Sequence, residues 1–183
     1  MIPKKIHYCW FGGNKKSKLI LECIKSWKRY FPDFDTDVEV IKRFPEELRV
    51  HSFSGIEEFS KLVAPGLVYG CEARDIIVHE MVNEYEHTKF DNLRIEDIIT
   101  INKRITRILD RYGYVHEDIY QDLGVLRVYP SEFFCAYDGK KRMTNITEKT
   151  LATHHYTASW LPWYRKIRLF CGTLLRRVIY RKG

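Results

Sequence analysis

Alternating acidic residues make the stretch 34–40 the part of the chain best suited to metal chemistry. If this stretch is a strand, Asp35, Asp37 and Glu39 lie on one face, because side chains alternate across a strand. Two carboxylates two residues apart can hold Mg²⁺ or Mn²⁺, which prefer oxygen ligands and usually share them with substrate phosphates. The stretch therefore indicates a diphosphate site, although an Asp-x-Asp triplet also arises by chance and 33–35 is a second one.

A histidine pair, His154–His155, ends a predicted strand near the other end of the chain. An imidazole at this point can add a nitrogen ligand to a cation that the acidic strand already holds. Ser159 and Trp160 follow closely, and they can close over a phosphate and a base. The alternative is a pair of surface histidines and a core tryptophan, so this block alone leaves both interpretations open.

The elements that would position these groups begin with a β-loop-α unit. Residues 5–10 are predicted to form a buried strand, closed by a turn at Gly12–Gly13, and a helix follows from Ser17 until Pro32 ends it. Ligands of open α/β sheets bind at the carboxyl ends of strands, which is where Trp10 lies. Trp10 can therefore stack on a base, but a tryptophan at a strand end is also a common core residue.

The rest of the body is predicted to continue as alternating helices and strands, which is typical of an α/β fold. The predicted helices are a short one at 46–48 and two amphipathic ones at 76–85 and 98–112, the last ended by Gly113. The predicted strands lie at 62–71, which is interrupted by tight bends, and at 125–129 and 133–135.

Length and composition predict one globular domain, because 183 residues with 45% hydrophobic content can bury a core. The five cysteines are scattered and form no CxxC pair, so they indicate neither a disulfide framework nor a zinc site and favour a reducing compartment. We find no signal peptide and no apolar run of about 18 residues, which predicts a protein that is neither secreted nor membrane-spanning.

The net charge of +7 is concentrated at the carboxyl end. From Arg165 onward the chain has basic residues and no acidic one, while basic and acidic residues balance in the remainder. A neutral body without a nucleic-acid motif argues against nucleic acid as a partner. Residues 161–183 are predicted to form a basic amphipathic helix on an anionic membrane surface, or else to pack on the body. The predicted location is cytoplasmic, peripheral at the inner face of the plasma membrane.

Several blocks, in order over residues 1–160, resemble one known family. The chain is similar to the bacterial capsular-polysaccharide and mannosyltransferase-like sugar transferases with the DXD sugar-binding region (glycosyltransferase family 32). The blocks are Ile2–Gly13, Cys23–Tyr30, Asp35–Val40, Ala64–Leu67, Tyr129–Cys135 and His154–Trp160.

The resemblance implies a GT-A fold, a Rossmann-like mixed sheet, over residues 1–160. It also implies metal-dependent, retaining transfer of a sugar from a nucleotide-diphosphate donor to a lipid-linked or surface polysaccharide acceptor, as in capsule biosynthesis. Carried over by position, Asp37 binds Mn²⁺ or Mg²⁺ directly, Asp35 contacts the ribose or the metal, and His155 is a further ligand of metal or diphosphate. The residues expected on the nucleotide sugar are Trp10, Asp35, Ser159 and Trp160. No catalytic residue is assigned.

The chain departs from the family before the DXD strand. Family members carry a further strand and helix there, ending in a segment that supplies an Asp and an Arg to the donor sugar and phosphate. Here Phe34 runs directly into Asp35, although a βα unit needs roughly 30 residues or more. The predicted fold therefore lacks one βα unit. This loss suggests an alternative function, a catalytically impaired remnant that acts as a membrane-associated interaction protein.

Overall fold

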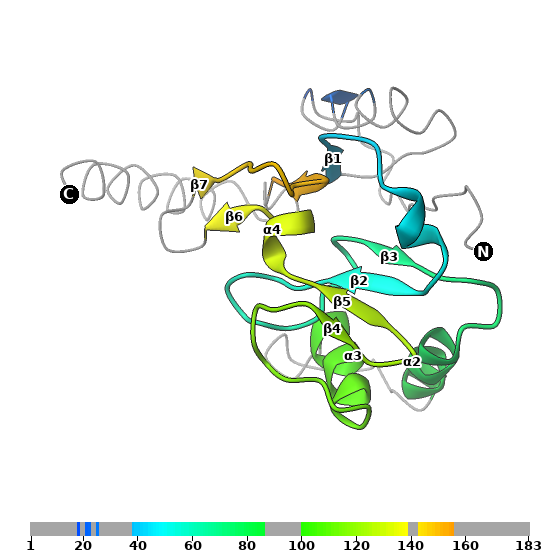
Figure 1. The fold of residues 1–183 in the computed structure, drawn as a ribbon. Helices are drawn as coiled ribbons and strands as arrows, with labels where there is room; N and C mark the ends of the chain where they lie inside the picture. Colours follow the sequence, from blue (N-terminus) through cyan, green and yellow to red (C-terminus); the bar gives the residue numbers. More distant parts are fainter. Residues whose placement is uncertain are drawn as a thin grey trace.

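The computed structural model describes residues 38–86, 100–138 and 143–155, together with positions 18, 21, 22 and 25. Over these ranges the fold is mixed α/β, with one four-stranded sheet and two two-stranded sheets (Figure 1). The predicted α/β class is confirmed at this level.

The four-stranded sheet forms the centre of the described part, in the order β3-β2-β5-β4. Its two inner strands, β2 (Phe53–Gly55) and β5 (Arg127–Tyr129), run parallel, and Phe53 is paired with Arg127. The outer strands, β3 (Tyr69–Gly70) and β4 (Gln121–Asp122), are each antiparallel to their neighbour. The sheet is therefore mixed.

Two helices, α2 (Ile76–Glu86) and α3 (Ile101–Asp110), pack with this sheet. They share a core whose fully buried members include Ile56, Val63, Ile77, Ile105, Ile108, Leu109 and Val128. Helix α3 begins where Thr100 accepts a hydrogen bond from the Lys103 amide, and it is followed by Gly113 at φ +86°. A glycine at this position confirms the predicted end of the helix, because a left-handed residue closes many helices.

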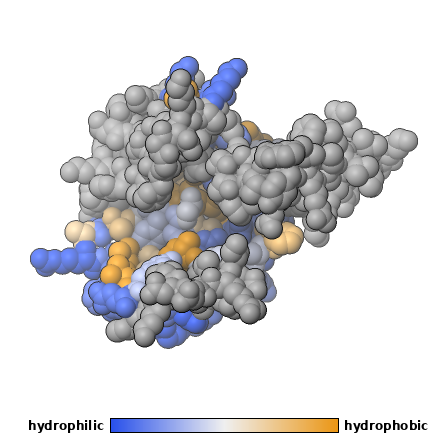
Figure 2. Space-filling view, turned by 180° about the vertical axis from the view of Figure 1, so that it is seen from behind, coloured by the Kyte–Doolittle hydropathy of each residue, from blue (hydrophilic) through white to orange (hydrophobic). Residues whose placement is uncertain are grey.

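Ion pairs join these two helices. Glu84 of α2 forms ion pairs with Arg104 and Arg107 of α3, and the Arg104 guanidinium lies 4.6 Å from the centre of the Tyr85 ring. In the view from behind, apolar side chains gather near the middle of the face and hydrophilic ones lie along its lower edge (Figure 2). The pairs hold α2 and α3 together, and Arg104 is itself buried.

A second layer lies above the sheet (Figure 1). It contains a two-stranded antiparallel sheet of β1 (Val38–Val40) and β8 (Ala152–His154), and a second one of β6 (Tyr137–Asp138) and β7 (Met143–Thr144). The one-turn helix α4 (Ser131–Phe134) connects this layer to the sheet, and the 3-10 helix η1 (Glu46–Arg49) follows β1. Phe134 is fully buried between the layers and forms ring contacts with Phe44 and Phe53.

The predicted strand at 133–135 is wrong, because Phe133 and Phe134 belong to helix α4. A short apolar run fits a buried helix as well as a buried strand, and its periodicity cannot separate the two. The Ser131 amide, which precedes the run, donates to an Asp118 oxygen at 2.7 Å, and this bond fixes the start of a helical turn. The Asp118 contact is remote in sequence, so the local pattern gave no sign of it.

The predicted strand at 62–71 is confirmed only in part: a tight bend is present at 65–67, as predicted, but little of the stretch forms a strand. Only Val63, which bridges to Ile56, and β3 at its end are extended and paired, and the residues between them form a turn. The inner strand β2 was not predicted, because Phe53, Ser54 and Gly55 are buried on both faces and show no alternation.

Candidate functional site

The acidic strand and the histidine block lie side by side, although they come from opposite ends of the described sequence. Strand β1 begins at Val38, the residue after Asp37, and β8 ends at His154, the residue before His155. The two strands pair antiparallel, with Val38 opposite His154. The structure therefore brings His155 to the strand that follows the Asp-x-Asp triplet in the sequence.

Across this pair, His155 Nε2 lies 2.6 Å from an oxygen of Glu39. The side chains of His155 and Glu39 are 25% and 39% exposed, so both are partly withdrawn from water. A carboxylate can only accept a hydrogen bond, which means that Nε2 is the donor. Charge-assisted bonds of this length are among the stronger hydrogen bonds in proteins.

Helix α4 holds β8, and with it His155, in place. The Leu151 amide donates to the Phe133 carbonyl at 2.8 Å, just before the strand. Within the strand, the buried Thr153 hydroxyl donates to the Cys135 carbonyl at 3.1 Å. One bond comes from the residue before β8 and the other from a side chain within it, so together they fix β8 against α4 and the residue that follows α4.

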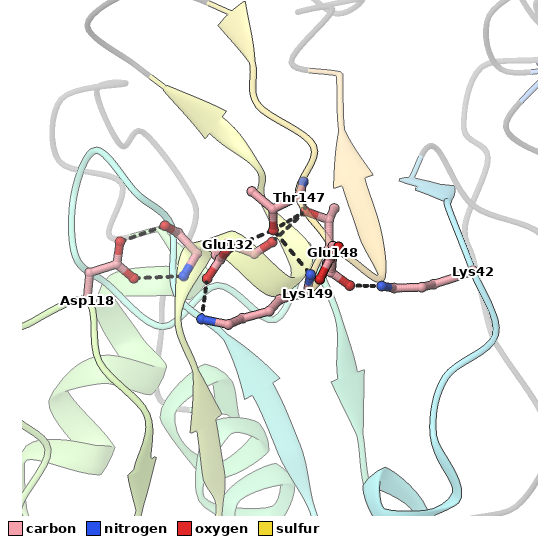
Figure 3. A network of polar contacts seen from close by, with 8 residues as sticks. Lys42, Asp118, Glu132, Thr147, Glu148 and Lys149 are labelled. Atoms are coloured by element: carbon pink, nitrogen blue, oxygen red, sulfur yellow. Dashed lines mark hydrogen bonds and ion pairs between the residues drawn. The ribbon is translucent and has the colours of Figure 1, made fainter.

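Polar contacts fix both sides of α4 in turn (Figure 3). On one side Asp118 accepts the Ser131 amide at 2.7 Å and the Ser131 hydroxyl at 2.6 Å, and it also lies 3.2 Å from Lys61 Nζ. On the other side Glu132 accepts the Thr147 hydroxyl at 2.7 Å. Short helices have little stability of their own, so these contacts stabilise the support of the site.

The charge on Glu132 is favoured by its neighbours. The hydrogen bond from Thr147 and the ammonium group of Lys149, 3.4 Å away, lower the pKa of this carboxyl below its ordinary value. Lys42, just after β1, donates to the carbonyl of Glu148 in the same loop (Figure 3). The loop before β8 is thus bound to α4 and to the segment after β1.

Donor chemistry limits which cation this site could hold. His155 offers an imidazole nitrogen, which fits an ion of the Mn²⁺ type better than Mg²⁺, and the Glu39 carboxylate is its hydrogen-bond partner. Among the residues that the structure describes, no group of three potential metal-binding side chains occurs. Within the described ranges His155 is therefore a single donor that fits such an ion, and the other proposed ligands, Asp35 and Asp37, lie outside these ranges.

Of the predicted site residues, the structure describes His155 alone. The others, Trp10, Asp35, Asp37, Ser159 and Trp160, lie outside the described residues, as does the predicted helix at 161–183. Among the helices of the described ranges, none is long and apolar enough to cross a membrane.

Sequence reasoning missed the role of Glu39 as a partner of His155. The sequence did contain a signal for Glu39: the strand alternation predicts its carboxylate on the same face as those of Asp35 and Asp37. The missing information was the pairing of β1 with β8, which joins residues 116 positions apart.

A second polar group was also missed, at the start of α2. Asp75 accepts hydrogen bonds from the Val78 amide at 3.0 Å, from the Tyr69 hydroxyl at 3.1 Å and from the Ser52 hydroxyl. Burial and the Asp75 carboxylate raise the pKa of Tyr69. An open pocket of about 280 Å³ adjoins this group. Asp75 has the contacts of a helix cap, and we assign it a structural role.

The comparison with known proteins adds no family to this picture. No family model, curated protein or solved structure matches the chain.

Proposed function

We propose that the chain is a metal-dependent glycosyltransferase domain of the GT-A type, lacking one βα unit before the Asp-x-Asp triplet. It would transfer a sugar, with retention, from a nucleotide-diphosphate donor to a lipid-linked or surface polysaccharide acceptor. The observation that supports this proposal is the pairing of β1 with β8, which brings His155 to the acidic strand at the Glu39 side chain. The described ends of the two sequence blocks are thus neighbours.

The proposed roles follow from the donor groups. Asp37, Asp35 and His155 would hold Mn²⁺ or Mg²⁺, and Trp10, Ser159 and Trp160 would contact the nucleotide. A bound cation supplies Lewis-acid neutralisation of the departing nucleoside diphosphate. The protein's own part is to fix these donors, and the β1–β8 ladder with its bonds to α4 provides a rigid support for His155.

A second candidate function, an impaired remnant that acts as a membrane-associated interaction protein, is favoured by a different observation. The chain has no room between Phe34 and Asp35 for the βα unit that precedes the triplet in the family it resembles. A strand that this unit would supply beside the metal site is then lost, and with it part of what positions the site. A catalytic metal site tolerates displacements of only about half an ångström, so activity is lost before cation binding.

The partners of both candidates include an anionic membrane surface, through residues 161–183, at the cytoplasmic face of the plasma membrane. The seven basic residues from Arg165 onward, balanced by no acidic residue, support this part of the proposal, and nucleic acid is not a proposed partner. Sedimentation with anionic liposomes tests it. Full-length protein should pellet and protein truncated after Trp160 should not, and equal recovery in the supernatant would refute the membrane contact.

A screen of donor hydrolysis across nucleotide sugars, with and without Mn²⁺, tests the enzymatic proposal. We expect turnover that requires Mn²⁺ and that falls roughly tenfold or more in His155→Ala, because a metal ligand is lost. His116→Ala is the matched control. His116 Nε2 also lies 2.8 Å from a carboxylate oxygen, that of Asp110 at the end of α3, away from the proposed site. Absence of turnover with every donor, together with retained Mn²⁺ binding, would favour the impaired remnant.

A further inference from the structure

We propose that Glu39 is a positioning residue, which accepts a hydrogen bond from the Nε2–H of His155 and so leaves Nδ1 as the nitrogen that binds a divalent cation. This inference rests on the proposed function, because it concerns the same site. It assigns to Glu39 a role through His155 and not as a metal ligand.

The strand ladder itself builds the contact. Glu39 is paired with Thr153, so the two side chains lie on the same face, and His155, two residues further, shares that face. Glu39 and His155 are therefore diagonal neighbours, a spacing that long side chains bridge. Glu39 is flanked by Val38 and Val40, which are 7% and 5% exposed and fix the orientation of the strand.

The tautomer follows from the chemistry of the two groups. A neutral imidazole has one N–H and one lone pair, and a carboxylate partner selects the nitrogen that carries the proton. With Nε2 only 2.6 Å from Glu39, the lone pair is left on Nδ1. Histidines that bind metals usually donate their other N–H to a carboxylate or carbonyl, and loss of that partner lowers metal affinity by about 10-fold to 100-fold.

The metal-free, full-length protein tests the tautomer directly. Long-range ¹H–¹⁵N correlation spectra of the imidazoles, recorded near pH 8 where ordinary histidines are neutral, identify the protonated nitrogen. The His155 signal is assigned by its loss in His155→Asn. We expect the Nε2–H form in the wild type and a mixture in Glu39→Leu, whereas Asp110→Asn should alter His116 and leave His155 unchanged.

The role in cation binding is tested by calorimetric titration of Mn²⁺ with UDP or GDP. Glu39→Leu should bind about 10-fold to 100-fold more weakly than the wild type. Glu39→Gln keeps an oxygen that can accept from Nε2, so its affinity should recover most of that loss. Urea unfolding of each variant checks that the fold is retained.

Each contrary result has a distinct meaning. An Nδ1–H tautomer in the wild type, or equal affinities for wild type and Glu39→Leu, would overturn the positioning role and leave the proposed function standing. Equal losses in Glu39→Gln and Glu39→Leu would overturn it as well, because they would make Glu39 a direct ligand. No Mn²⁺ binding by the wild type would remove both the inference and the proposed function.

Discussion

Replacing Asp118 by alanine should destabilise the protein by about 3 kcal/mol, because this carboxylate fixes the start of α4. It accepts the amide of Ser131 at 2.7 Å and its hydroxyl at 2.6 Å. Hydrogen bonds to a charged group contribute about 1.5–3 kcal/mol each, and an amide left without a partner in a buried position adds to the loss. Ser131 is 7% exposed, whereas Asp118 keeps 25% of its side chain in water, so we take the lower end of that range.

Urea unfolding measures this change, and with a slope of about 2 kcal/mol per M the midpoint should fall by about 1.5 M. The matched control is Asp122→Ala on the edge strand β4. Asp122 also accepts two hydrogen bonds, from the Gly124 amide at 3.0 Å and Arg127 Nε at 2.9 Å, but 46% of its side chain is exposed. Its loss should cost less than about 1 kcal/mol. Equal midpoints for the two variants would refute the argument that burial at α4 decides the difference.

Three further changes test other contacts. Burial, Asp118 and Asp110 raise the pKa of Tyr114 to about 12, whereas tyrosine in the unfolded state loses its proton near pH 10. The free energy of unfolding should therefore fall as pH rises across that interval. In alkaline unfolding scans, Tyr114→Phe should reduce this fall. Gly70→Ala should cost about 1–3 kcal/mol in thermal unfolding, because its Cβ would lie 2.2 Å from the Phe53 ring, while Gly66→Ala, which meets nothing, should be near neutral. Because the pKa of Glu132 is lowered in the folded protein, its carboxylate stabilises the fold at pH values above the ordinary pKa of a glutamate. This stability is lost as pH falls through the lowered pKa, so the free energy of unfolding of Glu132→Gln should fall less steeply with decreasing pH in acid unfolding scans.

The helices that cover the sheet could be predicted from the sequence, because their apolar residues recur at helical spacing. The predicted helix at 76–85 agrees closely with α2, and the predicted end of α3 agrees with the positive φ of Gly113. Here the local pattern and the tertiary packing favour the same structure.

The support of the candidate site could not be predicted in the same way. Helix α4 depends on Asp118, which is 13 residues from Ser131, and the Glu39–His155 contact depends on strands at opposite ends of the described chain. A local pattern contains no information on such pairings. The alternation predicted that Glu39 lies on the face opposite Val38 and Val40. The pairing of β1 with β8, which brings His155 to Glu39, is set by the topology and not by the local sequence.

We propose that the acidic strand and the histidine block form one cation site for a nucleoside diphosphate. The most direct test is calorimetric titration of Mn²⁺ with UDP or GDP into the wild type, Asp37→Ala and His155→Ala. We expect saturable binding by the wild type and a loss of about tenfold or more in each variant, with His116→Ala unchanged. Identical binding by the wild type, Asp37→Ala and His155→Ala would contradict it.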